Sequence, residues 1–127
     1  MTYKVLIVDD SKLARMSAAK LLSSCSPNFA RVEASSAAEA LSMMEKDAPD
    51  IALLDFNMPE RDGLNLAEDL RKLNPRMPIA VISANRQQEV VNRAGSVGAT
   101  FLAKPLDHDS LAGFMKKAEQ LLKSSGS

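Results

Sequence analysis

Short runs of apolar residues recur along this chain, and each is followed by a longer amphipathic stretch. The predicted strands are residues 5–8, 30–34, 51–54, 79–82 and 100–102. Residues 5–8, 51–54 and 79–82 are almost continuously apolar, which is typical of strands buried on both faces of a parallel sheet. Residues 30–34 alternate between apolar and polar side chains, so we expect them to form an edge strand.

The amphipathic stretches between these runs have the periodicity of helices. Helices are predicted over residues 11–24, 37–44, 66–73, 86–94 and 111–123. In the last stretch, the apolar side chains recur at helical spacing and form one continuous face. Its members are Leu111, Phe114, Met115, Ala118, Leu121 and Leu122.

Polar residues mark where two of these helices begin. Ser35 or Ser36 is expected to cap the second helix, and Asp107 or Asp109 the last one, because their side-chain oxygens can accept the free N–H groups of a first turn.

Methionines contribute to the predicted core. Met16, Met44 and Met115 lie on the apolar faces of predicted helices. We expect these flexible side chains to fill space in the core and not to form a binding surface.

Predicted strands and helices alternate from one end of the chain to the other. This pattern indicates an α/β fold, a doubly wound five-stranded parallel sheet with helices on both faces. We expect one domain over residues 1–123, with 124–127 as a flexible tail, the start of a linker or a cloning scar. In such sheets, ligands bind at the carboxyl ends of the strands, near the point where the strand order reverses.

The composition argues against several classes of protein. Sixteen Lys and Arg residues balance sixteen Asp and Glu residues, which gives no support to direct nucleic-acid binding or to a polybasic membrane binder. No apolar run approaches the length of a membrane span, and the N-terminus lacks the pattern of a signal peptide. Because Cys25 is the single cysteine and cannot form an intrachain disulfide, we expect a cytoplasmic protein.

Residues with chemical function lie directly after the predicted strands. They are Asp9, Asp10, Asp55, Ser83 and Lys104, with Pro105 following the lysine. An aspartate after one strand is ordinary, since it often caps the next helix. The convergence of three carboxylates, a hydroxyl and an ammonium group at one edge of a sheet indicates a functional site.

Three carboxylates at one edge repel one another. Two unit charges about 4 Å apart cost about 1 kcal/mol in water and about 4 kcal/mol at an effective dielectric constant of about 20. Carboxylate oxygens without a nearby His or Cys favour Mg²⁺ or Mn²⁺ over zinc as the counter-ion. One such ion and Lys104 together neutralise Asp9, Asp10 and Asp55, so the site can accept an anionic phosphoryl group.

Four stretches in this order resemble a known family. They are VLIVDDS (5–11), ALLDFNMPERDGL (52–64), AVISAN (80–85) and GATFLAKP (98–105). Together they resemble the response-regulator receiver domain, the phospho-acceptor module of two-component signalling, in particular its chemotaxis regulators. The resemblance implies a flavodoxin-like (βα)5 fold with strand order 2-1-3-4-5. It also implies a signalling phospho-acceptor that assists its own phosphoryl transfer and autodephosphorylation, and not an enzyme acting on another substrate.

The resemblance assigns roles to the acidic residues. Asp55 is the nucleophile that takes a phosphoryl group from the phosphohistidine of a sensor histidine kinase or a histidine phosphotransfer protein. Asp10 and Asp55 ligate Mg²⁺ directly, together with the backbone carbonyl of Asn57, and Asp9 acts through a bound water.

The resemblance also assigns the remaining residues. Ser83 hydrogen-bonds the phosphoryl oxygen, Lys104 pairs with it, and Pro105 follows a cis peptide bond. Phe101 matches the aromatic switch position, and the face of the fourth helix, fifth strand and fifth helix contacts the downstream protein. Ser83 stands where threonine is common, and it keeps the hydroxyl but lacks the methyl group. Phe101 stands where tyrosine is common, and it can turn inward but cannot donate a hydrogen bond.

Three other functions are consistent with parts of the pattern. A haloacid-dehalogenase-type phosphatase also uses an Asp with Mg²⁺ at a strand end, but that family has D-x-D after its first strand. Here Asp55, Phe56 and Asn57 give D-x-N after the third predicted strand. The chain is alternatively a receiver fragment of a larger regulator or a hybrid kinase. The presence of all five strand-end functional residues argues against the third, a degenerate receiver that is not phosphorylated.

Overall fold

Every predicted apolar run forms a strand of one parallel sheet. In this computed structural model, which describes residues 3–25 and 29–125, the strands are β1 (Tyr3–Val8), β2 (Phe29–Ala34), β3 (Ile51–Asp55), β4 (Ile79–Ser83) and β5 (Thr100–Ala103). Neighbouring strands pair in parallel, in the order β2-β1-β3-β4-β5. The predicted sheet and its strand order are therefore confirmed.

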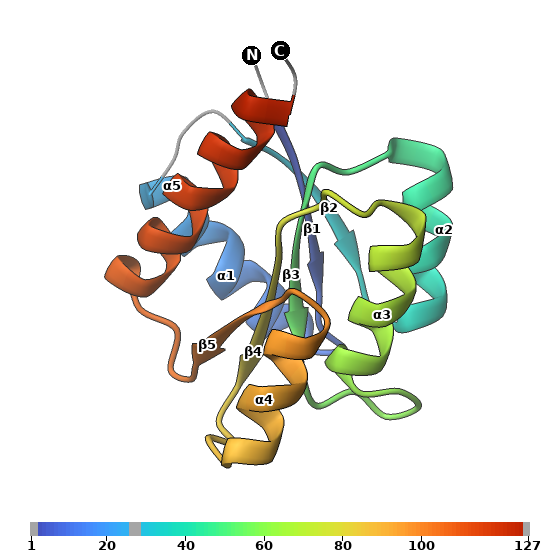
Figure 1. The fold of residues 1–127 in the computed structure, drawn as a ribbon, viewed down its shortest axis with the longest axis vertical. Helices are drawn as coiled ribbons and strands as arrows, with labels where there is room; N and C mark the ends of the chain where they lie inside the picture. The colour runs from blue at the N-terminus through green and yellow to red at the C-terminus, as the bar shows by residue number, and fades with distance from the viewer. Residues whose placement is uncertain (1–2, 26–28, 126–127) are drawn as a thin grey trace.

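Helices alternate with the strands and cover both faces of the sheet (Figure 1). They are α1 (Lys12–Cys25), α2 (Ala37–Asp47), α3 (Gly63–Leu73), α4 (Gln88–Ser96) and α5 (His108–Ser125). Leu53 of β3 packs in the cluster under α1 and α5, and the next residue, Leu54, packs in the cluster under α2, α3 and α4. Successive side chains of a strand point to opposite faces, so continuous apolar runs suit this doubly wound fold.

Burial along the strands follows their place in the sheet. All residues of β3 and β4 are buried, whereas β2 at the edge is largely exposed or half-buried. The strand order reverses beside β1, which pairs with β2 on one side and with β3 on the other. The arrowheads of β1 and β3 point to the lower end of the molecule in Figure 1, and the predicted site residues follow these strand ends.

The first residues of two helices distinguish between the predicted caps. Ser36, and not Ser35, caps α2 by accepting a hydrogen bond from the backbone N–H of Glu39 at 3.1 Å. At α5, Asp107 accepts a hydrogen bond from the backbone N–H of Ser110 at 2.7 Å. The helix begins at the residue after Asp107, which is earlier than its apolar stripe indicates.

Several helix boundaries differ from the predictions: α2 runs on to Asp47, α3 begins at Gly63, and both α4 and α5 are shifted. α4 lies slightly further along the chain than predicted, because the Asn85 side chain accepts a hydrogen bond from the backbone N–H of Gln87 and holds this segment in a turn. α5 runs to Ser125, so it includes Ser124 and Ser125 of the predicted tail. Residues 126–127 lie outside the described part of the chain.

The inward face of α1 differs from the prediction. Met16 is 56% exposed, so its predicted place in the core is wrong, whereas Met115 is buried as predicted and Met44 is half-buried against the core. Ala19 and Leu22 of α1 are buried, and Arg15 and Ala18 are among its half-buried residues. Their spacing of i, i+3, i+4 and i+7 defines one helix face, and Met16 lies beside that face.

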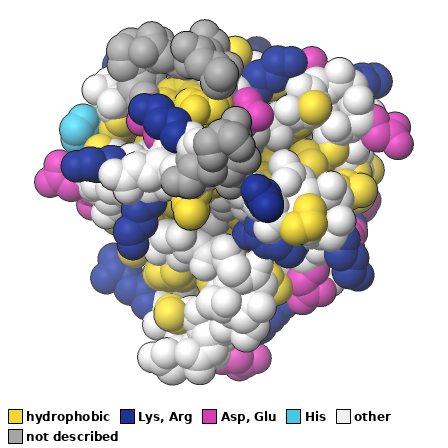
Figure 2. All heavy atoms as spheres, turned by 45° about the horizontal axis from the view of Figure 1, so that its top comes forward, with side chains coloured by type: hydrophobic (Ala, Val, Ile, Leu, Met, Phe, Trp, Pro, Cys, Tyr) yellow, Lys and Arg dark blue, Asp and Glu magenta, His cyan; other side chains and the backbone are white. Residues whose placement is uncertain are grey.

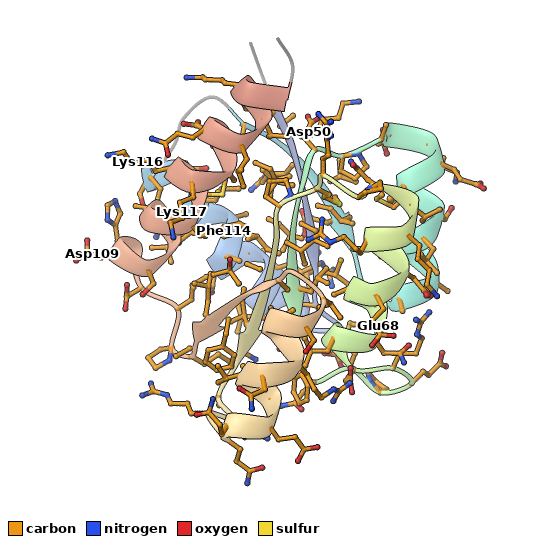
Figure 3. All side chains as sticks on the ribbon, in the orientation of Figure 1. Asp50, Glu68, Asp109, Phe114, Lys116 and Lys117 are labelled. Atoms are coloured by element: carbon orange, nitrogen blue, oxygen red, sulfur yellow. The ribbon has the colours of Figure 1, made fainter. Side chains whose placement is uncertain are left out.

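The outward faces carry mixed charge. On α5, Phe114 lies on the side facing the sheet, whereas Lys116 and Asp109 lie on the outer side (Figure 3). Figure 2 shows basic and acidic side chains interspersed over one face of the molecule, with small apolar areas between them. None of the helices in the described residues is both long and apolar enough to cross a membrane.

Gly63, at the start of α3, contacts the end of β3. A Cβ atom at this position would lie 2.5 Å from the backbone oxygen of Asp55 and 3.1 Å from the Cα atom of Phe56. Because these are backbone atoms, they cannot rotate away as a side chain would. We predict that Gly63→Ala lowers the free energy of unfolding by about 1–3 kcal/mol, as measured by urea denaturation.

Gly113, within α5, provides the matched control. A Cβ atom there meets no heavy atom within 4 Å, so Gly113→Ala is expected to stabilise the helix by about 0.5–1 kcal/mol. Similar effects of the two substitutions would contradict the importance of close packing at Gly63.

Candidate functional site

The sheet brings the three predicted acidic residues together. Asp9 and Asp10 follow β1, and Asp55 is the last residue of β3, the neighbouring strand. Each offers a carboxylate oxygen, and these atoms all lie within 4.8 Å of one another. Asp55 is buried, Asp9 is half-buried and Asp10 is exposed, so the cluster reaches from the end of the sheet to solvent.

Lys104 lies directly against the buried carboxylate. Its Nζ atom donates to Oδ1 of Asp55 at 2.7 Å, and the Asp55 side chain is only 6% exposed. The backbone N–H of Lys104 donates to the carbonyl of Ser83 at 3.0 Å, which holds the ends of β5 and β4 together. The peptide bond between Lys104 and Pro105 is cis, as predicted.

The surroundings of Asp9 shift the pKa of its carboxyl group upwards. Burial raises the pKa of its carboxyl group, and the negative charges of Asp55 and Asp10 raise it further. A hydrogen bond from the backbone N–H of Ser11 to Oδ1, at 2.9 Å, and the charge of Lys104 act in the opposite direction on this pKa. The net effect is an upward shift of this pKa, with burial as its largest cause.

The other predicted residues surround this cluster at different depths. Ser83 is fully buried at the end of β4, and its hydroxyl oxygen accepts a hydrogen bond from the backbone N–H of Asn85 at 2.9 Å. Asn57 is exposed in the loop after β3. Phe101 of β5 is half-buried, and packs against the cluster under α2, α3 and α4.

A cavity of about 610 Å³ opens beside the acidic cluster. Asp9, Asp55 and Lys104 contribute its charged lining, and α1 and the segment after Lys104 contribute mainly apolar side chains. A reactant can therefore approach Asp55 although this carboxylate is buried.

Sequence reasoning missed one residue that contacts the site. Arg15 of α1 donates from Nη1 to the backbone carbonyl of Asp9 at 2.7 Å and from Nε to Oε1 of Glu33 at 3.1 Å. The helical spacing of Arg15 with Ala18 and Leu22 could have identified it, since it places an arginine on the inward face.

The donor atoms fit a hard divalent cation. Carboxylate oxygens from Asp9, Asp10 and Asp55 are close enough to share one ion, and the described part of the chain places no His or Cys among them. Mg²⁺ and Mn²⁺ prefer such oxygen ligands, and either ion would offset the repulsion among these three carboxylates.

Comparison with known proteins gives the family. Residues 5–116 match the family model of the response regulator receiver domain. The chain belongs to this family. The chemotaxis protein CheY of Thermotoga maritima is 31% identical over 121 residues, which cover 94% of this chain and 100% of that protein. The family and the expected fold are thus confirmed.

Solved structures agree with this assignment. A CheY-like receiver domain protein from Methanospirillum hungatei JF-1 has a TM-score of 0.86 at 25% identity, covering 98% of this chain and 99% of that one. CheY in the CheX-CheY-BeF3-Mg complex from Borrelia burgdorferi has a TM-score of 0.81 at 27% identity, covering 91% and 87%. This receiver domain is a phospho-acceptor signalling module of the two-component type, and the comparisons give no support to the phosphatase alternative.

The raised pKa of Asp9 predicts the effect of neutralising this residue. The folded pKa exceeds that of the unfolded chain, so ionised Asp9 opposes folding at neutral pH. We predict that Asp9→Asn raises the midpoint of thermal unfolding at pH 7 in EDTA. As the pH falls through the raised pKa towards about 4, Asp9 is protonated first in the folded state, and the difference from wild type should shrink.

Asp107 provides a control with the opposite sign. Hydrogen bonds from the backbone and side chain of Ser110 lower its pKa, so ionised Asp107 favours folding. Asp107→Ala should lower the unfolding midpoint at pH 7, and this effect should fade below about pH 4. An Asp9→Asn variant that is less stable than wild type at pH 7 in EDTA would refute the electrostatic account of the cluster.

Proposed function

We propose that Asp55 accepts a phosphoryl group from the phosphohistidine of a sensor histidine kinase or a histidine phosphotransfer protein. The observation that carries the proposal is the contact between the Asp55 carboxylate and the Lys104 ammonium at 2.7 Å, inside a cluster with two further carboxylates. Asp55 is buried at the strand end, so its position is fixed, and the adjacent cavity gives a reactant access.

In the proposed reaction, the Asp55 carboxylate acts as the nucleophile without activation by another residue. Asp55 needs no general base, because a carboxylate is already an anion at neutral pH. One of its oxygens attacks phosphorus, the P–N bond of the phosphohistidine breaks, and its electron pair returns to the imidazole ring. The product is an acyl phosphate on Asp55. Lys104 then pairs with the new phosphoryl oxygens, and the Ser83 hydroxyl donates a hydrogen bond to one of them.

Mg²⁺, or Mn²⁺ in its place, is the cofactor in this proposal. Asp10 and Asp55 would hold it directly, with the backbone carbonyl of Asn57, and Asp9 would hold it through a water molecule. When bound, the ion supplies positive charge that neutralises the carboxylates and the transferred group. The proposal is supported by the acidic cluster and by the related CheY, whose complex contains Mg²⁺ together with BeF3, a mimic of a phosphoryl group.

We propose that the face formed by α4, β5 and α5 binds the downstream protein that receives the signal. Two contacts join the site to α4 and the segment before it. Arg93 of α4 pairs with Asp62 of the loop after β3 at 3.4 Å, and Arg86 donates to the backbone carbonyl of Lys104 at 3.5 Å. Movement of Ser83 and Lys104 towards a phosphoryl group would therefore act on α4, and Phe101 would rotate into the space that is released. The partner on this face is a downstream protein, and neither nucleic acid nor a membrane is required.

Two asparagines beside the acceptor bear on the proposed loss of the phosphoryl group. We propose that the domain assists its own dephosphorylation, with Asn57 and Asn85 at the entrance for the attacking water. We also propose a cytoplasmic location, which is consistent with a free thiol at Cys25, the single cysteine of the chain.

The acceptor assignment predicts the behaviour of an isosteric variant. Asp55→Asn should abolish labelling by radioactive acetyl phosphate in the presence of Mg²⁺, because an amide cannot form the acyl phosphate. Asp50→Asn is the matched control, since Asp50 lies just before the opposite end of the same strand and should label like wild type (Figure 3). Undiminished, acid-stable labelling of Asp55→Asn would refute the assignment.

The switch predicts long-range changes on phosphorylation. Shifting a two-state equilibrium from 1:99 to 99:1 requires about 5.5 kcal/mol, whereas one hydrogen bond to a charged oxygen supplies about 1.5–3 kcal/mol. Because Ser83 alone is too weak, we expect the active form to be partly populated before phosphorylation. Addition of beryllofluoride and Mg²⁺ should move the NMR signals of Phe101 and α4 from positions between those of the inactive and active forms towards those of the active form.

The control is Asp55→Asn under the same conditions, which should show none of these shifts. Shifts that remain confined to the three aspartates in wild type, without reaching Phe101 or α4, would refute the switch.

A further inference from the structure

Arg15 occupies a position in α1 that normally suits an apolar residue. It shares the inward face of the helix with Ala19 and Leu22, which are buried, and its own side chain is only 14% exposed. Arginine is rarely buried unless it is paired. The contacts of Arg15 therefore explain why the sequence has an arginine here.

Those contacts join three elements at the acidic end of the sheet. Long side chains of a helix point towards its N-terminus, and Arg15 extends back from α1 to the loop after β1. Nη1 donates to the backbone carbonyl of Asp9 at 2.7 Å. Nε donates to Oε1 of Glu33 at 3.1 Å, and Glu33 belongs to β2, where it is paired with Ile7 of β1.

The carbonyl that Arg15 binds belongs to the peptide group between the two adjacent aspartates. A peptide group is planar, so the carbonyl of Asp9 and the N–H of Asp10 keep one fixed relation. On the other side, the backbone N–H of Asp9 donates to the carbonyl of Ala34 at 3.1 Å. A hydrogen bond on each side of Asp9 thus fixes the backbone from which both carboxylates project.

The charge of Arg15 does not explain its presence. A cation beside the acidic cluster would weaken the binding of another cation, and Glu33 offsets this charge locally. Any favourable effect of Arg15 on cation binding must therefore come from geometry. By positioning the carboxylates Arg15 would strengthen cation binding, whereas its charge would weaken it.

We propose that Arg15 is a positioning residue for the metal ligands, and that Glu33 holds Arg15 in place. By binding the Asp9 carbonyl, Arg15 orients the carboxylates of Asp9 and Asp10 towards a shared divalent cation. This inference rests on the proposed function, in which these aspartates hold Mg²⁺. Groups that orient metal ligands in this way commonly change metal affinity about 10–100-fold when they are removed.

The test measures the Mg²⁺ affinity of the full chain by calorimetry, without a phosphodonor. Arg15→Met keeps an extended side chain but loses both hydrogen bonds, and we expect it to raise the Kd for Mg²⁺ about tenfold. Arg15→Lys keeps the charge but cannot make both contacts, and its Kd should also rise. Arg31→Met is the matched control, because Arg31 is an exposed arginine of β2, and its Kd should stay within about twofold of wild type.

Glu33→Gln and the double variant test the chain of contacts. Glu33→Gln should raise the Kd for Mg²⁺. The double variant Arg15→Met, Glu33→Gln should have the same Kd as Arg15→Met, because Glu33 acts only by holding Arg15. In acetyl phosphate labelling, the Mg²⁺ concentration at half-maximal rate should rise in Arg15→Met, and the rate at saturating Mg²⁺ should stay near the wild-type rate. A general loss of folding would instead lower the rate at saturating Mg²⁺, so circular dichroism of Arg15→Met and Arg15→Lys is recorded alongside.

The outcomes separate this inference from the proposed function. If wild type binds Mg²⁺ and Arg15→Met and Arg15→Lys bind it equally well or more tightly, the positioning role is wrong and the phospho-acceptor assignment stands. If wild type does not bind Mg²⁺, the metal site itself is wrong, and the inference fails with it.

Discussion

Parallel strands force like charges together in this protein. The carboxyl ends of β1 and β3 meet at one edge, and the carboxylates that follow them come within 4.8 Å of one another. The strands cannot move apart to relieve the repulsion, because β3 is buried along its whole length between two layers of helices. The free energy of apolar burial therefore holds a charge cluster that would not form on its own.

The rest of the site can be understood as partial compensation of that charge. Lys104 places an ammonium group on Asp55, a backbone N–H group binds Asp9, and Arg15 binds the main chain without adding uncompensated charge. Burial, together with the charges of Asp55 and Asp10, still raises the pKa of Asp9. A resting state that retains excess negative charge attracts a divalent cation, and with that cation the same site can tolerate an incoming anion.

The sequence was sufficient to predict the sheet and the residues at its carboxyl edge. Apolar runs such as that of β3 have few alternatives to a buried parallel strand, and the residue that follows each run is then placed by topology alone. The inward face of α1 was not predictable in the same way. Hydrophobicity favoured Met16 for the core, but Arg15 takes the inward position because its hydrogen-bond partners, Asp9 and Glu33, come from other elements. Ser36 and Ser35 are likewise indistinguishable as caps until the backbone is known.

The contact of Gly63 with the end of β3 has a consequence for how this domain can diverge. The N–H of Gly63 donates to the carbonyl of Phe56 at 2.9 Å, so both ends of the intervening loop are fixed to each other beside the acceptor strand. For a loop that is closed at its base, changes in length cost little free energy, since the closure entropy grows slowly with length. Residues 58–61, between Asn57 and Asp62, can thus acquire new lengths and sequences, and with them new partners or signal lifetimes, while the acceptor carboxylate remains in place.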